Sequence, residues 1–345
     1  MWLEYRRFFT AIVFVATGMA TPVASPAATT FTVNPPADRT DATAKGMALW
    51  CGRAGAATQG RIQCAVANAH IRDQDAAAAL QAGKVDLICF SHKTDPLRYK
   101  ISRIADLPLL GDFAETTSVA YQRVYEKTPL MAKEHKGYKV LAVFTQPPGF
   151  LFNGEDSRYL IGTAREFMAR PGHKKMRTAI MFKGGVANVS FVFALNQDTW
   201  NRLSAQDKDA LDRISGIEAA GLLGRMLDAE EWRANVGMHN AGISFHSPTV
   251  AILAQSQKYF AAAEKVWIAQ ARSAGIKHPP PLLAAFRKGI FQQEDAELGC
   301  ACRRRRLANL TATSNFNSRR ALPPGLDRFL LLPVAELRHV RRLYL

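Results

Sequence analysis

Short apolar segments alternate with helical segments from residue 29 to residue 145, and this alternation limits the possible folds more than any other feature. The segment "DQDAAAALQAGK" predicts an Ala-rich helix, and "SVAYQRVYEKTPLMAKEHKG" predicts another. Nearly continuous apolar strands that alternate with helices are typical of parallel βαβ units covered on both faces. We therefore expect an α/β fold with a parallel sheet. The predicted strands are Phe31–Val33, a segment that begins at Arg61, Val85–Phe90 and Tyr138–Thr145.

The pattern changes after Pro147-Pro148-Gly149. The segment "SFVFALNQDTW" predicts one more strand, and the segment from Ser204 predicts a long helix that Gly216 could break. "ISFHSP" predicts a short strand. We expect Ser247-Pro248 to cap a helix that runs to about Ala274, and a short helix around "PLLAAFRKGIFQQE" to end the regular structure.

The N-terminal sequence has the pattern of a secretory signal peptide. Arg6 and Arg7 precede an apolar stretch from Phe8 to about Ala20, and small residues and prolines follow it. We expect residues 1–27 to be the signal peptide, with an uncleaved membrane anchor as the alternative. The apolar stretch is short for a membrane span, and no other segment reaches that length. The pattern predicts an exported, periplasmic protein.

The formal net charge of the chain is +16, and half of this excess lies in the last 48 residues. From Leu298 onward the chain has ten Arg, no Lys and two acidic residues. This segment could be a basic arm, a small extra domain, or translated sequence that was never selected to fold. The abrupt change in composition favours the third interpretation, so we expect residues 297–345 to be an Arg-rich, disordered tail.

Five cysteines are compatible with an oxidising compartment but do not define a disulfide framework. Cys51 could pair with Cys64, and Cys300 could have a partner as well, or all five could be incidental thiols. The sequence has no G-x-S-x-G elbow, P-loop, G-x-G-x-x-G or H-E-x-x-H motif. His239 and His246 lack flanking carboxylates, which disfavours a metal site there. We expect the protein not to be an enzyme and to bind no metal or cofactor.

Four separated blocks carry a family resemblance: "LQAGKVDLICFSHKTDP", "SRIADLPLLGDFAETTSVAYQRVYEK", "HKGYKVLAVFTQPPGFLF" and "FVFALNQDTWNRLSAQDKDALDRISG". In their order and spacing they resemble the solute-binding proteins of TRAP (tripartite ATP-independent periplasmic) transporters, of the C4-dicarboxylate-binding type. The resemblance covers about residues 30–155 and 176–296, and it is strongest around "ADLPLLGDFAE".

The resemblance implies a two-domain periplasmic-binding-protein clamshell, type II-like, which closes on its ligand by a hinge motion. Domain I would comprise residues 28–148 and about 203–245. A shortened domain II would comprise residues 149–202 and about 246–296. The resemblance also implies that the protein captures a small organic acid and delivers it to the TRAP membrane permease subunits, with no nucleic acid as a partner.

The same resemblance identifies Arg177 as the residue that anchors the carboxylate of the ligand. In the family, an Arg that ends a strand in a "GxKxR" context holds this group, and "GHKKMRT" supplies the match with Gly172 and Lys175. A guanidinium presents a planar fork of donors that fits a carboxylate. The alternative is that this segment is an ordinary basic surface loop.

Three further positions match the family's pocket more weakly. Asn34 ends the first strand and could contact polar groups of the ligand. Ser91 and His92 follow the strand Val85–Phe90, where the first domain lines the cleft and where open α/β sheets favour ligand sites. For His92, a histidine in a surface loop is an equally good interpretation.

The sequence departs from the family pattern directly after Arg177. Thr178 passes into "AIMFKGGVANVSFVFALN", although the family continues here through further βα segments, so one or two such units are absent. An internal deletion, or two compensating frame errors, would explain both this gap and the atypical tail. Two alternatives to a working solute receptor therefore stay open. One is a damaged relative that no longer binds, and the other is an exported basic protein that binds nucleic acid or anionic lipid through its tail.

Overall fold

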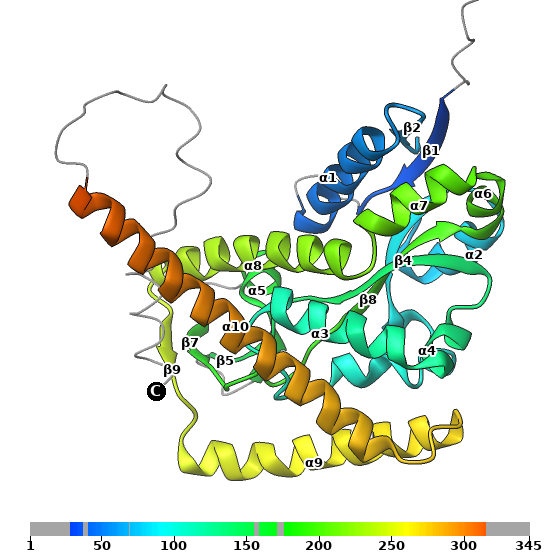
Figure 1. Cartoon of the computed structure of the whole chain (residues 1–345). Helices are drawn as coiled ribbons and strands as arrows, with labels where there is room; N and C mark the ends of the chain where they lie inside the picture. The colour runs from blue at the N-terminus through cyan, green and yellow to red at the C-terminus, as the bar shows by residue number, and fades with distance from the viewer. Residues whose placement is uncertain (1–27, 37–40, 69, 155–158, 171–175, 315–345) are drawn as a thin grey trace, which may run out of the picture.

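The computed structural model describes residues 28–36, 41–68, 70–154, 159–170 and 176–314. The predicted signal peptide and residues 315–345 of the predicted tail lie outside these ranges. The described residues form two sheets with helices packed around them (Figure 1). Within these ranges, no helix combines the length and the apolar character that a membrane span needs.

The larger sheet, sheet A, has five strands in the order β2-β1-β3-β8-β4. β1 is parallel to β2 and β3, whereas β8 is antiparallel to both of its neighbours, β3 and β4. The prediction of a parallel sheet is therefore correct for β1, β2 and β3. It is wrong for β8, which lies beside β3 and runs antiparallel to it. The strands of sheet A are β1 (Thr29–Asn34), β2 (Ile62–Val66), β3 (Leu87–Ser91), β4 (Tyr138–Thr145) and β8 (Ser190–Asn196).

β8 can occupy an interior position in sheet A, between β3 and β4, because both of its faces are apolar. Val192 is fully buried in the core on one side of the sheet, and Phe193 is fully buried in the core on the other side. A strand that is covered on both faces has a continuous apolar sequence whatever the direction of its neighbours. The sequence therefore predicts the strand but not its orientation.

Sheet A carries helices on both faces. Trp50 on α1 packs against Phe193 on one face, and Tyr121 on α3 packs against Phe286 on the other. The helices of this part are α1 (Ala42–Ala57), α2 (Ala76–Gln81), α3 (Ala114–Lys127), α4 (Pro129–Glu134), α6 (Gln197–Arg202) and α7 (Ala205–Ile214). Three short 3-10 helices, Asp73–Asp75, His92–Thr94 and Ser102–Asp106, lie in the connections.

The smaller sheet, sheet B, has four strands in the order β6-β5-β7-β9. β5 is antiparallel to β6 and β7, and β7 is parallel to β9. Its core is small and centres on Phe152, which stacks on Phe167 of α5. The elements of this part are β5 (Phe150–Gly154), β6 (Tyr159–Gly162), α5 (Ala164–Met168), β7 (Met176–Ile180) and β9 (Ser244–His246).

The predicted long helix is broken at Gly216, as expected. α7 ends at Ile214, and α8 (Ile217–Asn240) begins after Gly216, whose φ of 59° favours glycine. Leu223 of α8 packs in a core of sheet A, whereas Met238 of the same helix packs in the core of sheet B. α8 therefore spans the two sheets (Figure 1).

Two predictions about the last helices are wrong. The cap of α9 (Val250–Ser273) is Thr249 rather than Ser247-Pro248, because the Thr249 side chain accepts a hydrogen bond from the Ile252 amide. α10 (Pro279–Ser314) does not end near residue 296 but continues into the segment predicted to be a disordered tail (Figure 1). The physical reason is that "CRRRRLANL" contains no Pro or Gly and is rich in residues with high helix propensity.

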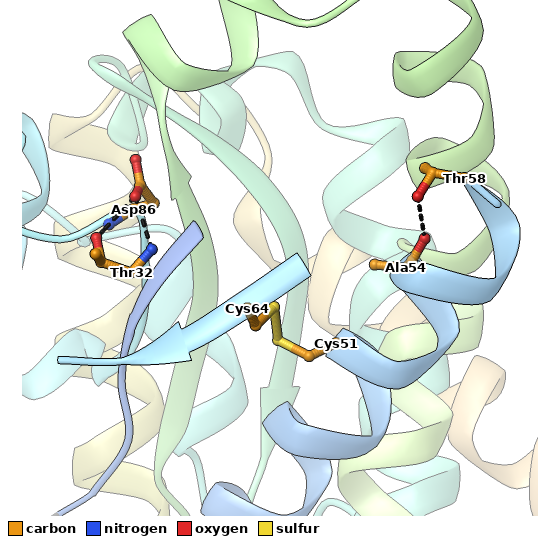
Figure 2. The surroundings of a disulfide bond; sticks show 6 residues. All are labelled: Thr32, Cys51, Ala54, Thr58, Cys64 and Asp86. Carbon is orange, nitrogen blue, oxygen red and sulfur yellow. Dashed lines mark hydrogen bonds between the residues drawn. A yellow bond between two sulfur atoms is a disulfide. The ribbon is translucent and has the colours of Figure 1, made fainter. Parts of the chain in front are cut away.

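Of the alternatives that the sequence left open for the cysteines, the structure shows the pairing of Cys51 with Cys64. Their disulfide joins α1 to β2, with Cα atoms 5.9 Å apart (Figure 2). A hydrogen bond from the Thr58 hydroxyl to the Ala54 carbonyl closes α1 close to this bond (Figure 2). Cys89 is a free thiol in β3.

Candidate functional site

Asn34 lies at the carboxyl end of β1, and its side chain is buried. Its Oδ1 accepts a hydrogen bond of 2.9 Å from the Ile71 amide, and its Nδ2 donates one of 3.3 Å to the Ile71 carbonyl. Both ends of this amide are therefore used to hold the loop after β2. One N–H and one oxygen lone pair of this amide are not used by these two bonds.

Ser91 lies at the carboxyl end of β3, three residues beyond Ile88, which pairs with Asn34 at the end of the parallel strand β1. Its hydroxyl accepts a hydrogen bond from the Lys93 amide and caps the short helix His92–Thr94. Its own amide donates to the Asp73 carboxylate at 3.1 Å. The Asn34 and Ser91 side chains thus belong to neighbouring parallel strands, and both already have hydrogen-bond partners.

The structure places His92 in the core and not in a loop that lines a cleft. The side chain is fully buried. Its Nδ1 lies 3.0 Å from the Ser190 hydroxyl, and its Nε2 lies 2.9 Å from Nε2 of His135. Burial lowers the pKa of His92 well below its usual value and lowers the pKa of His135 to about 4. His92 is therefore part of the protein core, because the side chains around it separate it from solvent.

Arg177 lies near the start of β7 and not at the end of a strand, and its side chain is exposed. Its neighbour Thr178 pairs with Asn153 of β5 on one side and with Ser244 of β9 on the other. Arg177 therefore lies on sheet B, whereas Asn34, Ser91 and His92 belong to sheet A. Gly172 and Lys175 of the predicted anion-binding motif lie outside the described residues.

A paired ribbon joins the two sheets. Residues 146–149 lead from β4 to β5, and residues 181–189 lead from β7 back to β8. The Gln146 amide donates to the Val189 carbonyl at 3.1 Å, and the Gly149 amide donates to the Ala187 carbonyl at 2.9 Å. The chain therefore crosses between the two sheets through two hydrogen-bonded backbone segments.

A tight glycine loop lies within the second segment of the ribbon, residues 181–189. The amides of Leu109 and Leu110 donate to the carbonyls of Gly185 and Gly184, and the Gly184 amide donates to the Asp112 carboxylate at 2.6 Å. Gly184 has a φ of 76°, and a Cβ atom there would lie 2.8 Å from the Leu109 backbone. This loop binds the "ADLPLLGDFAE" segment directly.

A surface cavity of about 620 Å³ lies elsewhere and contains none of the four predicted site residues. Four basic side chains line it, together with apolar residues such as Leu97 and Leu130: Arg98, Lys100, Lys133 and Lys136. In the described part of the chain, no three His, Cys, Asp or Glu side chains gather as they would around a metal ion.

The sequence analysis missed an acidic turn of α8, formed by Asp228, Glu230 and Glu231. Asp228 accepts hydrogen bonds from the amides of Ala114 and Glu115, at 2.7 and 2.9 Å. Glu231 accepts from the amides of Ala164 and Arg165, and Glu230 accepts from the amide of Ala42. The run "DAEE" in a helix with an apolar face could have indicated these contacts, because acidic side chains near a core are usually paired.

Comparisons with known proteins agree with this architecture. No family model matches the chain. A TRAP periplasmic solute-binding protein from Bordetella bronchiseptica with bound (R)- and (S)-mandelate superposes with a TM-score of 0.70 at 24% identity, over 76% of this chain and 99% of the other. The chain has the fold of the TRAP solute-binding proteins. The predicted α/β clamshell and the family resemblance are confirmed at the level of the fold.

Two further relatives extend the comparison. A marine metagenome TRAP solute-binding protein specific for aromatic acid ligands, in complex with 3-hydroxybenzoate, gives a TM-score of 0.67 at 20% identity, over 77% of this chain and 99% of the other. The outer membrane transporter protein TsaT of Comamonas testosteroni is 25% identical over 276 residues, which include 66% of this chain and 81% of TsaT. Because 66% of 345 residues is fewer than 276, that alignment contains positions of TsaT that this chain lacks.

Proposed function

We propose that this protein is the periplasmic solute-binding subunit of a TRAP transporter, which captures a small organic acid and delivers it to the membrane permease. The observation that carries the proposal is the fold match to TRAP solute-binding proteins that hold small acids. The Cys51–Cys64 disulfide agrees with it, because such bonds persist in oxidising compartments such as the periplasm. The N-terminal export pattern agrees as well.

The ligand we propose is an aromatic monocarboxylate and not a C4-dicarboxylate. Mandelate and 3-hydroxybenzoate, the ligands of the two neighbours, each combine one carboxylate with one aromatic ring. A receptor for such an acid needs one cation for the carboxylate and apolar surface for the ring. One arginine therefore suffices, whereas a dicarboxylate would call for a second cationic partner.

Arg177 is our candidate for the carboxylate anchor. It lies on a strand held by neighbours on both sides, β5 and β9, so the backbone under its side chain is fixed. The side chain is exposed, so that a ligand can reach the guanidinium. A bidentate bond to a carboxylate strengthens when closure of the clamshell removes water from it.

Thermal unfolding in the presence of a panel of acids tests this proposal. Mandelate, 3-hydroxybenzoate and a C4-dicarboxylate are added at about 100 times a typical dissociation constant, where binding adds about 2.7 kcal/mol to the stability of the folded state. We expect an aromatic acid to raise the melting temperature by roughly 5 °C and Arg177→Ala to remove this shift. Arg72→Ala, which changes an exposed arginine paired with Asp75, is the matched control and should keep the shift. A shift that persists in Arg177→Ala would show that the anchor is elsewhere.

The alternative to a working receptor is that the chain is a damaged relative of the solute-binding proteins and cannot bind a ligand. Two observations favour this candidate: the alignment with TsaT includes positions that this chain lacks, and a glycine loop closes the chain directly after β7. The same experiment separates the two candidates. A damaged relative unfolds cooperatively but shows no shift with any acid of the panel.

A further inference from the structure

The surface cavity of about 620 Å³ lies where three parts of the chain meet. These parts are the loop before the 3-10 helix Ser102–Asp106, the C-terminal end of α4 and the C-terminal end of α9 (Figure 1). A Cβ atom on Gly275, just after α9, would lie 3.5 Å from Leu130 of α4, so the chain is in close contact here. The volume of the cavity is within the range of roughly 300–1,000 Å³ that is typical of small-molecule sites.

The four basic side chains that line this cavity have no acidic partner. In the part of the chain that the structure describes, none of the four forms an ion pair with an Asp or Glu side chain. Lys100 donates only to the Ser273 hydroxyl, at 3.3 Å. Lys133 and Lys136 are exposed, so their ammonium groups can turn toward a ligand. Unpaired cations around a concave surface attract small anions.

Arg98 is the fixed cation of the cavity. Its Nε donates to the Glu134 carbonyl and its Nη2 donates to the Lys136 carbonyl, both at 2.7 Å. The Cζ atom lies 5.3 Å from the ring centroids of both Tyr99 and Tyr138. A guanidinium has more N–H donors than these two bonds use, so donors remain for a ligand. The side chain is positioned before a ligand binds, which reduces the entropy lost on binding.

Glu134 is the acidic residue among those that line the cavity, and its carboxylate is already bonded elsewhere. Its Oε1 accepts a hydrogen bond of 2.7 Å from the Ile101 amide. Its Oε2 accepts from the amide and the hydroxyl of Ser102, at 2.9 and 2.6 Å. These contacts hold the carboxylate at the start of the 3-10 helix, and it does not pair with the lysines.

The charges of the lining groups favour a ligand with two negative charges. Four cations and one carboxylate leave a net charge of +3. The C-terminal ends of α4 and α9 each contribute about half an elementary negative charge. The neighbouring residues Asp95 and Arg272 carry opposite charges. About two positive charges therefore remain for a ligand to neutralise.

We propose that this cavity is a second ligand site, which binds a small organic dianion. The acidic groups of the ligand contact Arg98 and the lysines of the α4 end, and its apolar body lies on Leu97 and Leu130. Leu97 is 78% exposed, so an apolar ligand surface that covers it is removed from water together with it. The proposal goes beyond solute capture and does not depend on it, because Arg177 does not line this cavity.

An amide NMR titration of the full chain at low ionic strength tests the site. Isophthalate, an aromatic dicarboxylate, is the probe, and benzoate, which has the same ring and one carboxylate, is the matched control. We expect isophthalate to shift the amide signals of Ile101, Lys136 and Gly137 in a saturable way. Benzoate should bind there about fivefold more weakly, because it lacks one charge-assisted contact. Equal affinities for the two acids at these amides would overturn the proposal.

Two double variants test whether the cavity itself attracts the dianion. Lys133→Gln with Lys136→Gln removes two exposed cations of the cavity and should weaken isophthalate binding about tenfold at the Ile101 amide. Lys45→Gln with Lys258→Gln removes the same charge from exposed positions of α1 and α9 that do not line the cavity, and it should keep the affinity. An equal loss in both double variants would show attraction to the net charge of the chain and refute the site.

Arg177→Ala separates this site from the proposed receptor site. The shifts that isophthalate causes at Ile101 and Gly137 should persist in this variant. Shifts confined to sheet B, or no saturable shift at the cavity amides of the unmodified protein, would overturn the proposal. If no acid binds at sheet B, the receptor proposal fails, whereas saturable shifts at the cavity would still support the second site.

Discussion

His92 and His135 form a buried pair in which a backbone carbonyl fixes the position of the ring proton of neutral His135. Nδ1 of His135 donates to the Met131 carbonyl at 2.7 Å, so its Nε2 has to be an acceptor when the ring is neutral. Nε2 of His92 then donates across the 2.9 Å contact. A proton added to His135 would place two donors face to face, and the neutral state of the His135 ring is therefore favoured.

We predict that the His135 imidazole stays neutral at pH 5. Burial lowers its pKa to about 4, whereas a histidine in the unfolded chain titrates near 6.5. The unfolded state binds more protons between these values, so this group makes the folded state less stable by about 3 kcal/mol as the pH falls from 6.5 to 4. Nitrogen chemical shifts measured by NMR report the protonation state directly, and a midpoint near pH 6.5 would contradict the buried pair.

At the residue scale, the sequence could identify candidate ligand contacts but not their partners. Asn34 was predicted to end the first strand, and it does, whereas Ser91 was predicted to follow a strand and is the last residue of β3. The role of His92 could not be predicted, because its partners Ser190 and His135 lie 98 and 43 residues away in the sequence. Long-range hydrogen bonds of this kind leave no local pattern.

α3 and α8 approach each other closely at Gly224. A Cβ atom at this position would lie 2.5 Å from the Cα of Glu115 and 2.8 Å from the carbonyl carbon of Ala114. These are backbone atoms and cannot rotate away. The glycine therefore sets the distance between the two helices beside the acidic turn.

We predict that Gly224→Ala destabilises the protein by about 2 kcal/mol, because the added methyl group forces α3 and α8 apart. Gly221→Ala, one turn earlier on α8, is the control. There a Cβ atom would lie 3.4 Å from a methyl group of Val119, which is an ordinary contact. The control should be neutral or gain up to about 1 kcal/mol from helix propensity. Chemical denaturation of both variants measures the difference, and equal stabilities would contradict the close approach.

At the scale of elements, the sequence predicts where most strands and helices lie but not how strands are oriented. The sequence predicts the break at Gly216 because a glycine interrupts a helical pattern there. The sequence does not predict that β8 lies between β3 and β4, because this position depends on how the chain returns from sheet B. The continuation of α10 past residue 296 follows from helix propensity, which the change in composition obscured.

The whole molecule consists of two unequal layers that the chain crosses repeatedly. The ribbon of residues 146–149 and 181–189 connects the sheets through backbone hydrogen bonds. α8 connects them through its acidic turn, and α9 connects them through Phe260 and Trp267, which belong to different cores. Sheet A has a large core on both faces, whereas the core of sheet B is small. This asymmetry means that sheet B is the layer in which a lost segment would affect function most.

The central claim is that this two-layer chain still captures an aromatic carboxylate, and isothermal titration calorimetry tests it most directly. Titration of the folded protein with mandelate or 3-hydroxybenzoate should give saturable heat with one ligand per chain, and Arg177→Ala should remove that heat. Absence of saturable heat with every acid, from a protein that unfolds cooperatively, would contradict the claim and identify the chain as a receptor fold that has lost its ligand site.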